Sequence, residues 1–303
     1  MDTDFIKGVI VPILTPIDEN EIINEQVLRK MVNYVIAGGV HGILLYGSNG
    51  EFFAVEYEEL ARGIEIVLDE TKGRVPVYAG VGAITTRKCV RIAQLAVQKG
   101  VQGISVLQPM FIAPSEEELY GHFKEIAESV PDTAVLLYNN SARTHYNISA
   151  DLAVRLNETV DNVVGIKDSS GDMTLLAEYV RLTRHTNFKV LAGKDTLIYA
   201  SLAQGAVGCV ATTANFLPAY VTDIYNKYTE NNLPGALAAQ FRLTPIRKAL
   251  DLASFPVGTK DIANLMGLQV GAPYKPNQNS PGVVLEKMKS ILSKAGLKIE
   301  AES

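Results

Sequence analysis

The segment NVVGIKDSSGD, residues 162–172, is a short apolar run that ends abruptly at Lys167. Val163, Val164 and Ile166 are β-branched, which favours a buried strand, and the composition of residues 169–171 is typical of a turn. The pattern therefore predicts that Lys167 stands where a buried strand emerges into a loop.

Two interpretations fit a lysine at this junction. Removing an ammonium group from water disfavours its charged form, and the neutral amine that results can attack a carbonyl to form a Schiff base. Alternatively, Lys167 pairs with a carboxylate such as Asp168 and has a structural role. This segment alone leaves both interpretations open.

Similar apolar runs recur along the chain at intervals of roughly 20–35 residues, with helical patterns between them. Continuous rather than alternating apolar runs indicate strands that are buried on both faces. Asn24 is expected to cap a helix that continues to Ala37, and Ser115 is expected to cap another. The expected strands are Gly8–Leu14, Gly42–Tyr46, Val75–Gly80, Gly103–Leu107, Thr133–Tyr138, Asn162–Lys167, Phe188–Ala192 and Gly205–Ala211.

Eight such units predict an α/β fold, the (β/α)8 TIM barrel of about 250 residues. We expect the barrel over residues 1–217, and over residues 218–303 an extension of further helices packed on it as part of one structural unit. The competing fold, a doubly wound open sheet, requires a glycine-rich phosphate loop after the first strand. The chain has Thr15-Pro16-Ile17-Asp18 at that place.

Charge and composition exclude several classes of function. The net charge of −5 provides no basic face for nucleic acid or for anionic lipid. No stretch approaches the roughly 20 apolar residues of a membrane span, and the start lacks the pattern of a signal peptide. Cys89 and Cys209 lie in apolar segments, as core thiols of a reducing compartment do. We therefore expect a soluble cytoplasmic protein.

Barrel enzymes build their sites at the carboxyl ends of the strands. The four histidines show no metal-ligand spacing, and Ser48 has no histidine partner at a neighbouring strand end, so metal-assisted and serine-nucleophile chemistry are unsupported. The predicted strand ends carry Thr15, Ser48, Asn49, Phe111, Tyr138, Lys167, Lys194, Asp195 and Thr212.

Three of these features suggest chemistry, and each has a plainer alternative. Tyr138 is expected beside Lys167, where its phenol can carry protons, unless it only bonds to backbone. The turn Gly47-Ser48-Asn49-Gly50 offers N–H groups and short polar side chains to a carboxylate, unless it is a simple connection. Arg143 can clamp a second carboxylate, unless it is an ordinary surface arginine.

Four motifs together resemble the dihydrodipicolinate synthase / N-acetylneuraminate lyase family in order and spacing, from about Gly8 to the last helices. They are Gly47-Ser48-Asn49-Gly50-Glu51, Tyr138-Asn139, Gly165-Ile166-Lys167-Asp168 and Gly205-Ala206-Val207-Gly208. The resemblance implies a pyruvate-dependent class I aldolase or lyase on a TIM barrel, a lyase of carbon–carbon bonds that is usually a homotetramer and needs no metal or organic cofactor.

The resemblance also implies roles for individual residues. Lys167 would form the Schiff base with pyruvate or a 2-oxo acid, and Tyr138 would transfer protons. Ser48 and Asn49 would hold the pyruvyl carboxylate, and the Val210 backbone would line the same pocket.

The departures from the family pattern concern the substrate. The synthases usually have two threonines at Ser48 and Asn49, and a Tyr-Tyr pair at Met110-Phe111. The second of those tyrosines, lent across a subunit interface, relays protons, whereas Phe111 has no hydroxyl. Arg143, however, stands where the synthases hold the carboxylate of their aldehyde substrate.

The Ser-Asn turn followed by Phe52 is more similar to the aldolases of 2-keto-3-deoxy sugar acids and of 4-hydroxy-2-oxoglutarate. We therefore predict an aldolase for such acids. The alternative is a 4-hydroxy-tetrahydrodipicolinate synthase, which condenses pyruvate with aspartate semialdehyde. A third interpretation is a non-catalytic barrel that binds a phosphorylated ligand through Gly193-Lys194-Asp195 and the loop after the eighth strand.

Overall fold

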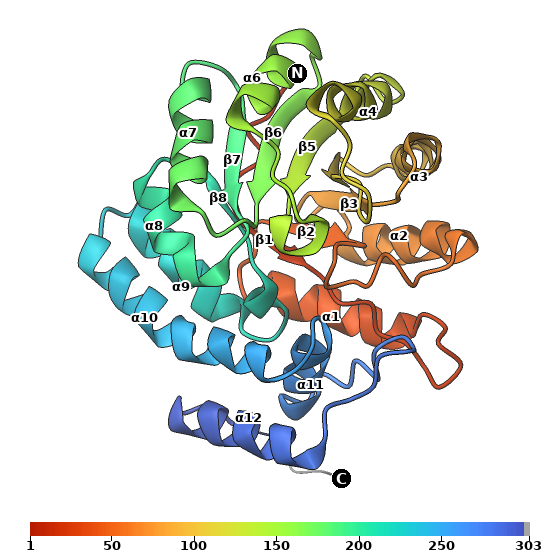
Figure 1. The fold of residues 1–303 in the computed structure, drawn as a ribbon. Coiled ribbons are helices and arrows are strands. Elements are labelled where there is room, and N and C mark those ends of the chain that lie inside the picture. Colours follow the sequence, from red (N-terminus) through yellow and green to blue (C-terminus); the bar gives the residue numbers. More distant parts are fainter. Residues whose placement is uncertain (300–303) are drawn as a thin grey trace.

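The computed structural model describes residues 1–299, which contain a closed barrel of eight parallel strands in sequential order (Figure 1). The strands are β1 (Gly8–Pro12), β2 (Gly42–Leu45), β3 (Val77–Val81), β4 (Gly103–Leu107), β5 (Ala134–Asn139), β6 (Val163–Asp168), β7 (Lys189–Ala192) and β8 (Gly208–Val210). The ring closes because β1 pairs with β8, with Gly8 opposite Gly208. This architecture confirms the predicted (β/α)8 barrel and excludes the open sheet.

Helices follow the strands and surround the barrel (Figure 1). Asn24 caps the first helix by accepting a hydrogen bond from the Val27 N–H at 3.2 Å, and Ser115 forms a capping box with Glu118 at the fourth. Both predicted caps are therefore confirmed. The surrounding helices are α1 (Glu25–Ala37), α2 (Tyr57–Thr71), α3 (Thr86–Lys99), α4 (Glu116–Glu128), α6 (Ala150–Thr159), α7 (Met173–Thr183), α8 (Ile198–Ala203) and α9 (Pro218–Thr229).

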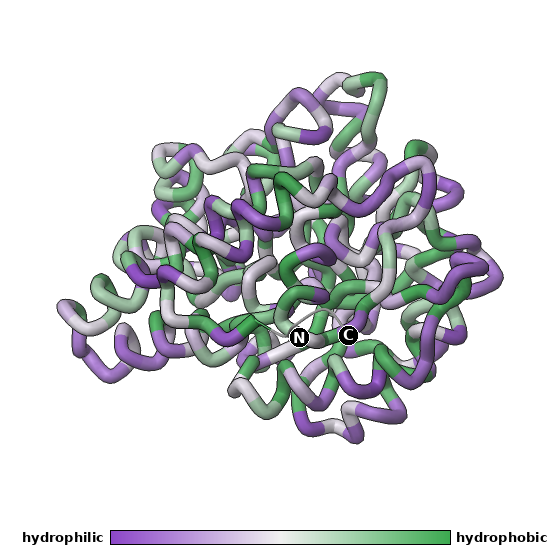
Figure 2. The backbone as a smooth tube through the Cα atoms, turned by 90° about the horizontal axis from the view of Figure 1, so that it is seen from below, coloured by the Kyte–Doolittle hydropathy of each residue, from purple (hydrophilic) through white to green (hydrophobic). Residues whose placement is uncertain are grey.

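The hydrophobic core has two layers. Side chains such as Ile10, Tyr78, Leu136 and Val210 fill the interior of the barrel, and a larger cluster lies between the strands and the helices. Figure 2 shows hydrophobic segments gathered toward the middle of the fold and hydrophilic segments mostly at its periphery. Because both faces of each strand are covered, the strands are apolar throughout, as their sequences indicated.

Several strands are shorter than predicted, and the backbone explains the differences at β2 and β8. β2 ends at Leu45 because Tyr46 adopts a left-handed conformation with φ of 55°, which no strand continues. β8 begins at Gly208 rather than Gly205. Gly205 has φ of 103°, and its N–H bonds to the Leu202 carbonyl at the end of α8, so it belongs to the turn before the strand.

In the described part of the chain, three further α-helices follow α9 and lie outside the ring (Figure 1): α10 (Leu233–Ala249), α11 (Val257–Leu265) and α12 (Gly282–Lys294). α9 itself, where the expected extension begins, packs against β1 as the other surrounding helices pack on the barrel. Residues 300–303 of that extension lie outside the described residues. Within residues 1–299, no helix is long and apolar enough to cross a membrane.

Two helical glycines provide a matched test of packing. A Cβ on Gly63 in α2 would lie 1.9 Å from the Tyr46 hydroxyl, whereas a Cβ on Gly121 in α4 would meet nothing within 4 Å. Gly63→Ala should therefore lower the free energy of unfolding by about 1–3 kcal/mol, the usual cost of overpacking.

Gly121→Ala should instead raise the free energy of unfolding by about 0.5–1 kcal/mol, because alanine favours the helix. Urea unfolding of both variants measures these changes. Equal effects of the two substitutions would contradict the packing of Tyr46 against α2.

Candidate active site

Lys167 and Tyr138 meet at the carboxyl rim of the barrel. They are register partners on β6 and β5, and both are buried. The Lys167 Nζ atom lies 3.9 Å from the centroid of the Tyr138 ring. Within residues 1–299, Lys167 forms no ion pair with Asp168, whose carboxylate accepts hydrogen bonds from Asn139 and Ser170. The structural alternative for Lys167, a pair with Asp168, therefore has no support.

The Tyr138 hydroxyl contacts side chains rather than backbone. It lies 3.3 Å from the Ser48 Oγ atom and accepts a hydrogen bond from Asn140 Nδ2 at 2.8 Å. Burial acts to raise the pKa of Tyr138, but the charge of Lys167 and hydrogen bonding to Ser48 outweigh it, so this pKa lies below its usual value. A phenol with a lowered pKa exchanges protons more readily near neutral pH.

The turn after β2 places Ser48 against Tyr138. Left-handed residues flank it, with φ of 55° at Tyr46 and 53° at Glu51. The Asn49 side chain donates to the Thr212 hydroxyl at 3.0 Å and accepts from Thr259 at 3.3 Å. The N–H groups of Ser48 and Asn49 form no hydrogen bond with other residues of the described chain, so both can receive a carboxylate.

The other predicted site residues lie in different surroundings. Val210 ends β8 and belongs to the inner layer of the barrel. Arg143 is exposed, and its guanidinium lies 4.7 Å from the centroid of the Phe255 ring. Phe111 is 86 % exposed and does not line the small cavity between Ser48 and Tyr138. Within this chain, Phe111 is therefore not part of the pocket that contains Ser48 and Tyr138.

Gln108, at the end of β4, is a residue of the site that sequence analysis missed. Its Nε2 atom donates to Thr144 Oγ1 at 2.8 Å and to the Tyr146 carbonyl at 2.6 Å, and its Oε1 atom accepts from the Asn140 N–H at 3.2 Å. These bonds fix the loop that carries Asn140 and Arg143. Its position directly after a predicted strand was the only available signal.

The loop after β8 does not provide the free donors that a phosphate requires. The Asp195 carboxylate accepts hydrogen bonds from the N–H groups of Thr212, at 3.1 Å, and Thr213, at 2.7 Å. It also accepts one from the Thr213 hydroxyl at 2.6 Å. These contacts weaken the phosphate-binding interpretation, which relied on the loop after the eighth strand together with Gly193-Lys194-Asp195.

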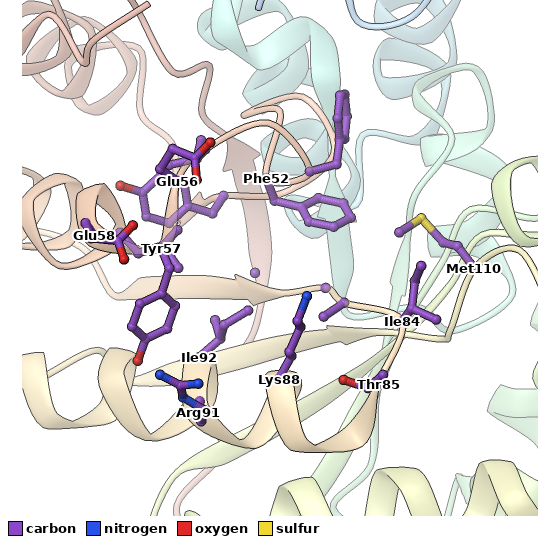
Figure 3. A pocket seen from close by; sticks show the side chains of 17 residues that line it. Phe52, Glu56, Tyr57, Glu58, Ile84, Thr85, Lys88, Arg91, Ile92 and Met110 are labelled. Atoms are coloured by element: carbon purple, nitrogen blue, oxygen red, sulfur yellow. The ribbon is translucent and has the colours of Figure 1, made fainter.

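A hollow of about 740 Å³ lies near the site, and Figure 3 shows the side chains that line it. Phe52, Ile84 and Met110 point into it, and Lys88 and Arg91 border it. Neither Lys167 nor Tyr138 lines it, but Phe52 also lines the small cavity between Ser48 and Tyr138. The two spaces are therefore neighbours, and Tyr138 lines the smaller one.

Residues 5–295 match the Dihydrodipicolinate synthetase family. The chain belongs to this family. It is 33 % identical over 295 residues to the 4-hydroxy-tetrahydrodipicolinate synthase of Thermoanaerobacter sp. (strain X514), covering 97 % of this chain and 98 % of the relative. Identity to the enzyme of that name from Thermus thermophilus is also 33 %, covering 96 % of this chain and 97 % of the relative.

Solved structures agree with this assignment. The dihydrodipicolinate synthase of Thermotoga maritima superimposes with a TM-score of 0.93 at 28 % identity, covering 96 % of this chain and 99 % of that one. The E. coli K12 prophage protein YagE, solved in complex with pyruvate, gives 0.92 at 26 % identity with the same coverage. Members of this family are aldolase-type lyases that use a lysine Schiff base, so the chain is an enzyme of this class.

Tyr138→Phe tests the proton-transfer role of the hydroxyl. The change keeps the ring beside Lys167 but removes the group that contacts Ser48, so turnover should fall roughly 10²–10⁴-fold, as for a lost acid–base group. Steady-state release of pyruvate from a 2-oxo acid measures it.

Tyr78→Phe is the control, because Tyr78 is buried in the barrel interior and its hydroxyl bonds to the Phe5 carbonyl. Its turnover should stay within about twofold of the original, since no acid–base group is lost. A similarly small effect of Tyr138→Phe would assign Tyr138 a structural role.

Proposed function

We propose that this chain is a pyruvate-dependent class I aldolase in which Lys167 forms the Schiff base. The observation that carries the proposal is the buried pair of Lys167 and Tyr138 at adjacent strand ends, with Nζ 3.9 Å from the ring centroid. A lysine without a carboxylate partner in the described chain, beside a hydroxyl that contacts Ser48, has the surroundings of a nucleophile.

The reaction follows from these groups. The Lys167 amine adds to the C2 carbonyl of a 2-oxo acid, and the carbinolamine loses water to give an iminium ion. When the C4 hydroxyl loses its proton, the C3–C4 bond breaks. The electron pair of that bond moves into the iminium, which gives an enamine and a free aldehyde. Protonation at C3 and hydrolysis then release pyruvate and the lysine amine. Tyr138 is the proposed carrier of these protons.

The iminium nitrogen accepts the electron pair of the broken bond, a role that a metal ion has in other aldolases. For this reason we propose that the reaction uses no metal and no organic cofactor. The N–H groups of Ser48 and Asn49 are the proposed ligands of the pyruvyl carboxylate, with Val210 on the wall of the same pocket.

Borohydride trapping tests this chemistry. Reduction in the presence of pyruvate should add the mass of the reduced adduct to the peptide that carries Lys167, because only a Schiff base is reduced in this way. Peptide mass spectrometry locates the adduct.

Lys167→Ala should abolish the adduct, and Lys194→Ala, which removes a lysine at the end of β7, should retain it. An adduct on Lys194, or none on the unmodified protein, would overturn the proposed mechanism.

For the substrate, we propose a 2-keto-3-deoxy sugar acid or a 4-hydroxy-2-oxo acid. The hydroxyl of Tyr138 contacts Ser48, and Phe111 contributes no further hydroxyl that would extend this path. The second candidate is the condensation of pyruvate with aspartate semialdehyde. The names of the relatives and the position of Arg143 at the rim, stacked on Phe255, favour it.

We also propose that a second copy of the chain covers the apolar surface beside the site, in a homotetramer. Contiguous exposed apolar patches mark interaction surfaces. Phe111 would then reach the site of the neighbouring subunit. The surface contains Phe53, Ile84, Phe111 and Ile112.

The two thiols, Cys89 and Cys209, are free and buried, which fits the proposed cytoplasmic location.

Arg143→Ala separates the substrate candidates. If Arg143 binds a second carboxylate, its loss should weaken the binding of substrates that carry this carboxylate by about 1.5–3 kcal/mol. The binding of substrates without a second carboxylate should not change. A panel of 2-keto-3-deoxy sugar acids, 4-hydroxy-2-oxoglutarate, and pyruvate with aspartate semialdehyde gives kcat/KM for each.

Arg155→Ala is the control for the loss of an exposed arginine, since Arg155 pairs with Glu117 on the outer helices. Equal losses for all substrates with Arg143→Ala would show that Arg143 supports the loop and binds no carboxylate.

A further inference from the structure

Helix α11 reaches the Ser48–Glu51 turn through two consecutive residues. The Thr259 hydroxyl donates to Asn49 Oδ1 at 3.3 Å, although these residues are 210 positions apart. Lys260 Nζ lies 2.7 Å from Glu51 Oε2, and both side chains are fully buried, with 0 % exposure. A helix of the C-terminal segment therefore contacts the proposed carboxylate-binding turn directly.

The Glu51–Lys260 pair joins three segments of the chain. Glu51 Oε1 accepts a hydrogen bond from the Tyr274 N–H at 3.0 Å, and Lys260 Nζ donates to the Ala272 carbonyl at 2.8 Å. Glu51 also has a left-handed backbone, with φ of 53°, which a non-glycine residue keeps only where its surroundings fix it. The ion pair supplies such a constraint immediately after Ser48 and Asn49.

The pair is distinct from the other ion pairs in residues 1–299. Each of those has both side chains more than a fifth exposed, on the surface of the molecule. A buried ion pair is a poor source of stability compared with apolar side chains of the same volume, because both charges lose their hydration. Because the Glu51–Lys260 pair lies beside the Ser48–Glu51 turn, its role is better explained as fixing the position of that turn.

We propose that Lys260 is a positioning residue for the carboxylate-binding turn. By holding Glu51, it fixes the backbone whose N–H groups receive the pyruvyl carboxylate, and Thr259 holds the neighbouring Asn49 side chain. The inference rests on the proposed function and assigns α11 a part in substrate affinity. Lys260 acts through geometry rather than by attracting the substrate, because its charge is buried and paired with Glu51.

The test compares Lys260→Met and the charge-balanced double variant Glu51→Gln/Lys260→Met with the unmodified chain. The readouts are the pyruvate concentration that gives half-maximal borohydride trapping, the trapping rate at saturating pyruvate, and the melting temperature. Both variants should raise the half-saturating concentration about tenfold or more, as a small displacement of binding groups does, and change the saturated rate much less.

Asp261→Asn is the matched control. Asp261 is the next residue of α11, and its carboxylate accepts a hydrogen bond from the Ser280 N–H, away from the turn. This variant should lower the melting temperature without changing half-saturation by pyruvate. Lys260→Arg, which keeps the positive charge, should recover part of the affinity lost in Lys260→Met.

The outcomes distinguish a positioning role of Lys260 from a role in stability alone. If the double variant melts earlier but keeps the original half-saturation, Lys260 only stabilises the fold and the inference is wrong. If the charge variants fail to fold, Thr259→Val gives the answer, because it removes only the hydroxyl that holds Asn49. Unchanged half-saturation in Thr259→Val would then overturn the inference. If the unmodified chain shows no pyruvate trapping, the proposed function itself fails.

Discussion

The barrel closes where β1 meets β8, and this closure depends on a contact between two glycines. A Cβ on Gly208 would lie 2.1 Å from the Gly8 carbonyl oxygen, and a Cβ on Gly8 would lie 2.3 Å from the His41 ring. A side chain at Gly208 would hold the first and last strands apart, and one at Gly8 would displace His41. Because β1 pairs with β8, the first and last strands leave no free edge and the sheet closes into a barrel.

Closure brings residues from distant parts of the sequence to one rim. Ser48 follows β2, Tyr138 lies on β5, Lys167 lies on β6 and Thr212 follows β8, yet a chain of contacts joins them. The strands hold the lysine and the tyrosine rigidly, whereas the turn that carries Ser48 needs support from outside the barrel. α11 provides that support, so the site is built from the strands and from the C-terminal segment together.

Local sequence patterns were sufficient to predict the barrel and the neighbouring positions of Lys167 and Tyr138. Buried parallel strands are apolar on both faces, so their runs are visible without an alignment, and Lys167 and Tyr138 mark their polar ends. The limits of the strands were less accurate, because a single left-handed residue such as Tyr46 or Gly205 ends or delays a strand without changing its apolar character. The support of the site could not be predicted in the same way. Nothing near Lys260 in the sequence indicates a partner in the turn after β2, because such contacts depend on how loops fold over one another, and hydrophobic periodicity carries no information about them.

The Asp195 carboxylate occupies a place where many TIM barrels bind phosphate. In TIM barrels, the loops after the last two strands frequently bind phosphate groups. Here a carboxylate of the protein occupies the amides of Thr212 and Thr213. An anion from solution would compete with a tethered group at a high effective concentration. The amides of this loop are thereby protected from phosphorylated compounds in solution.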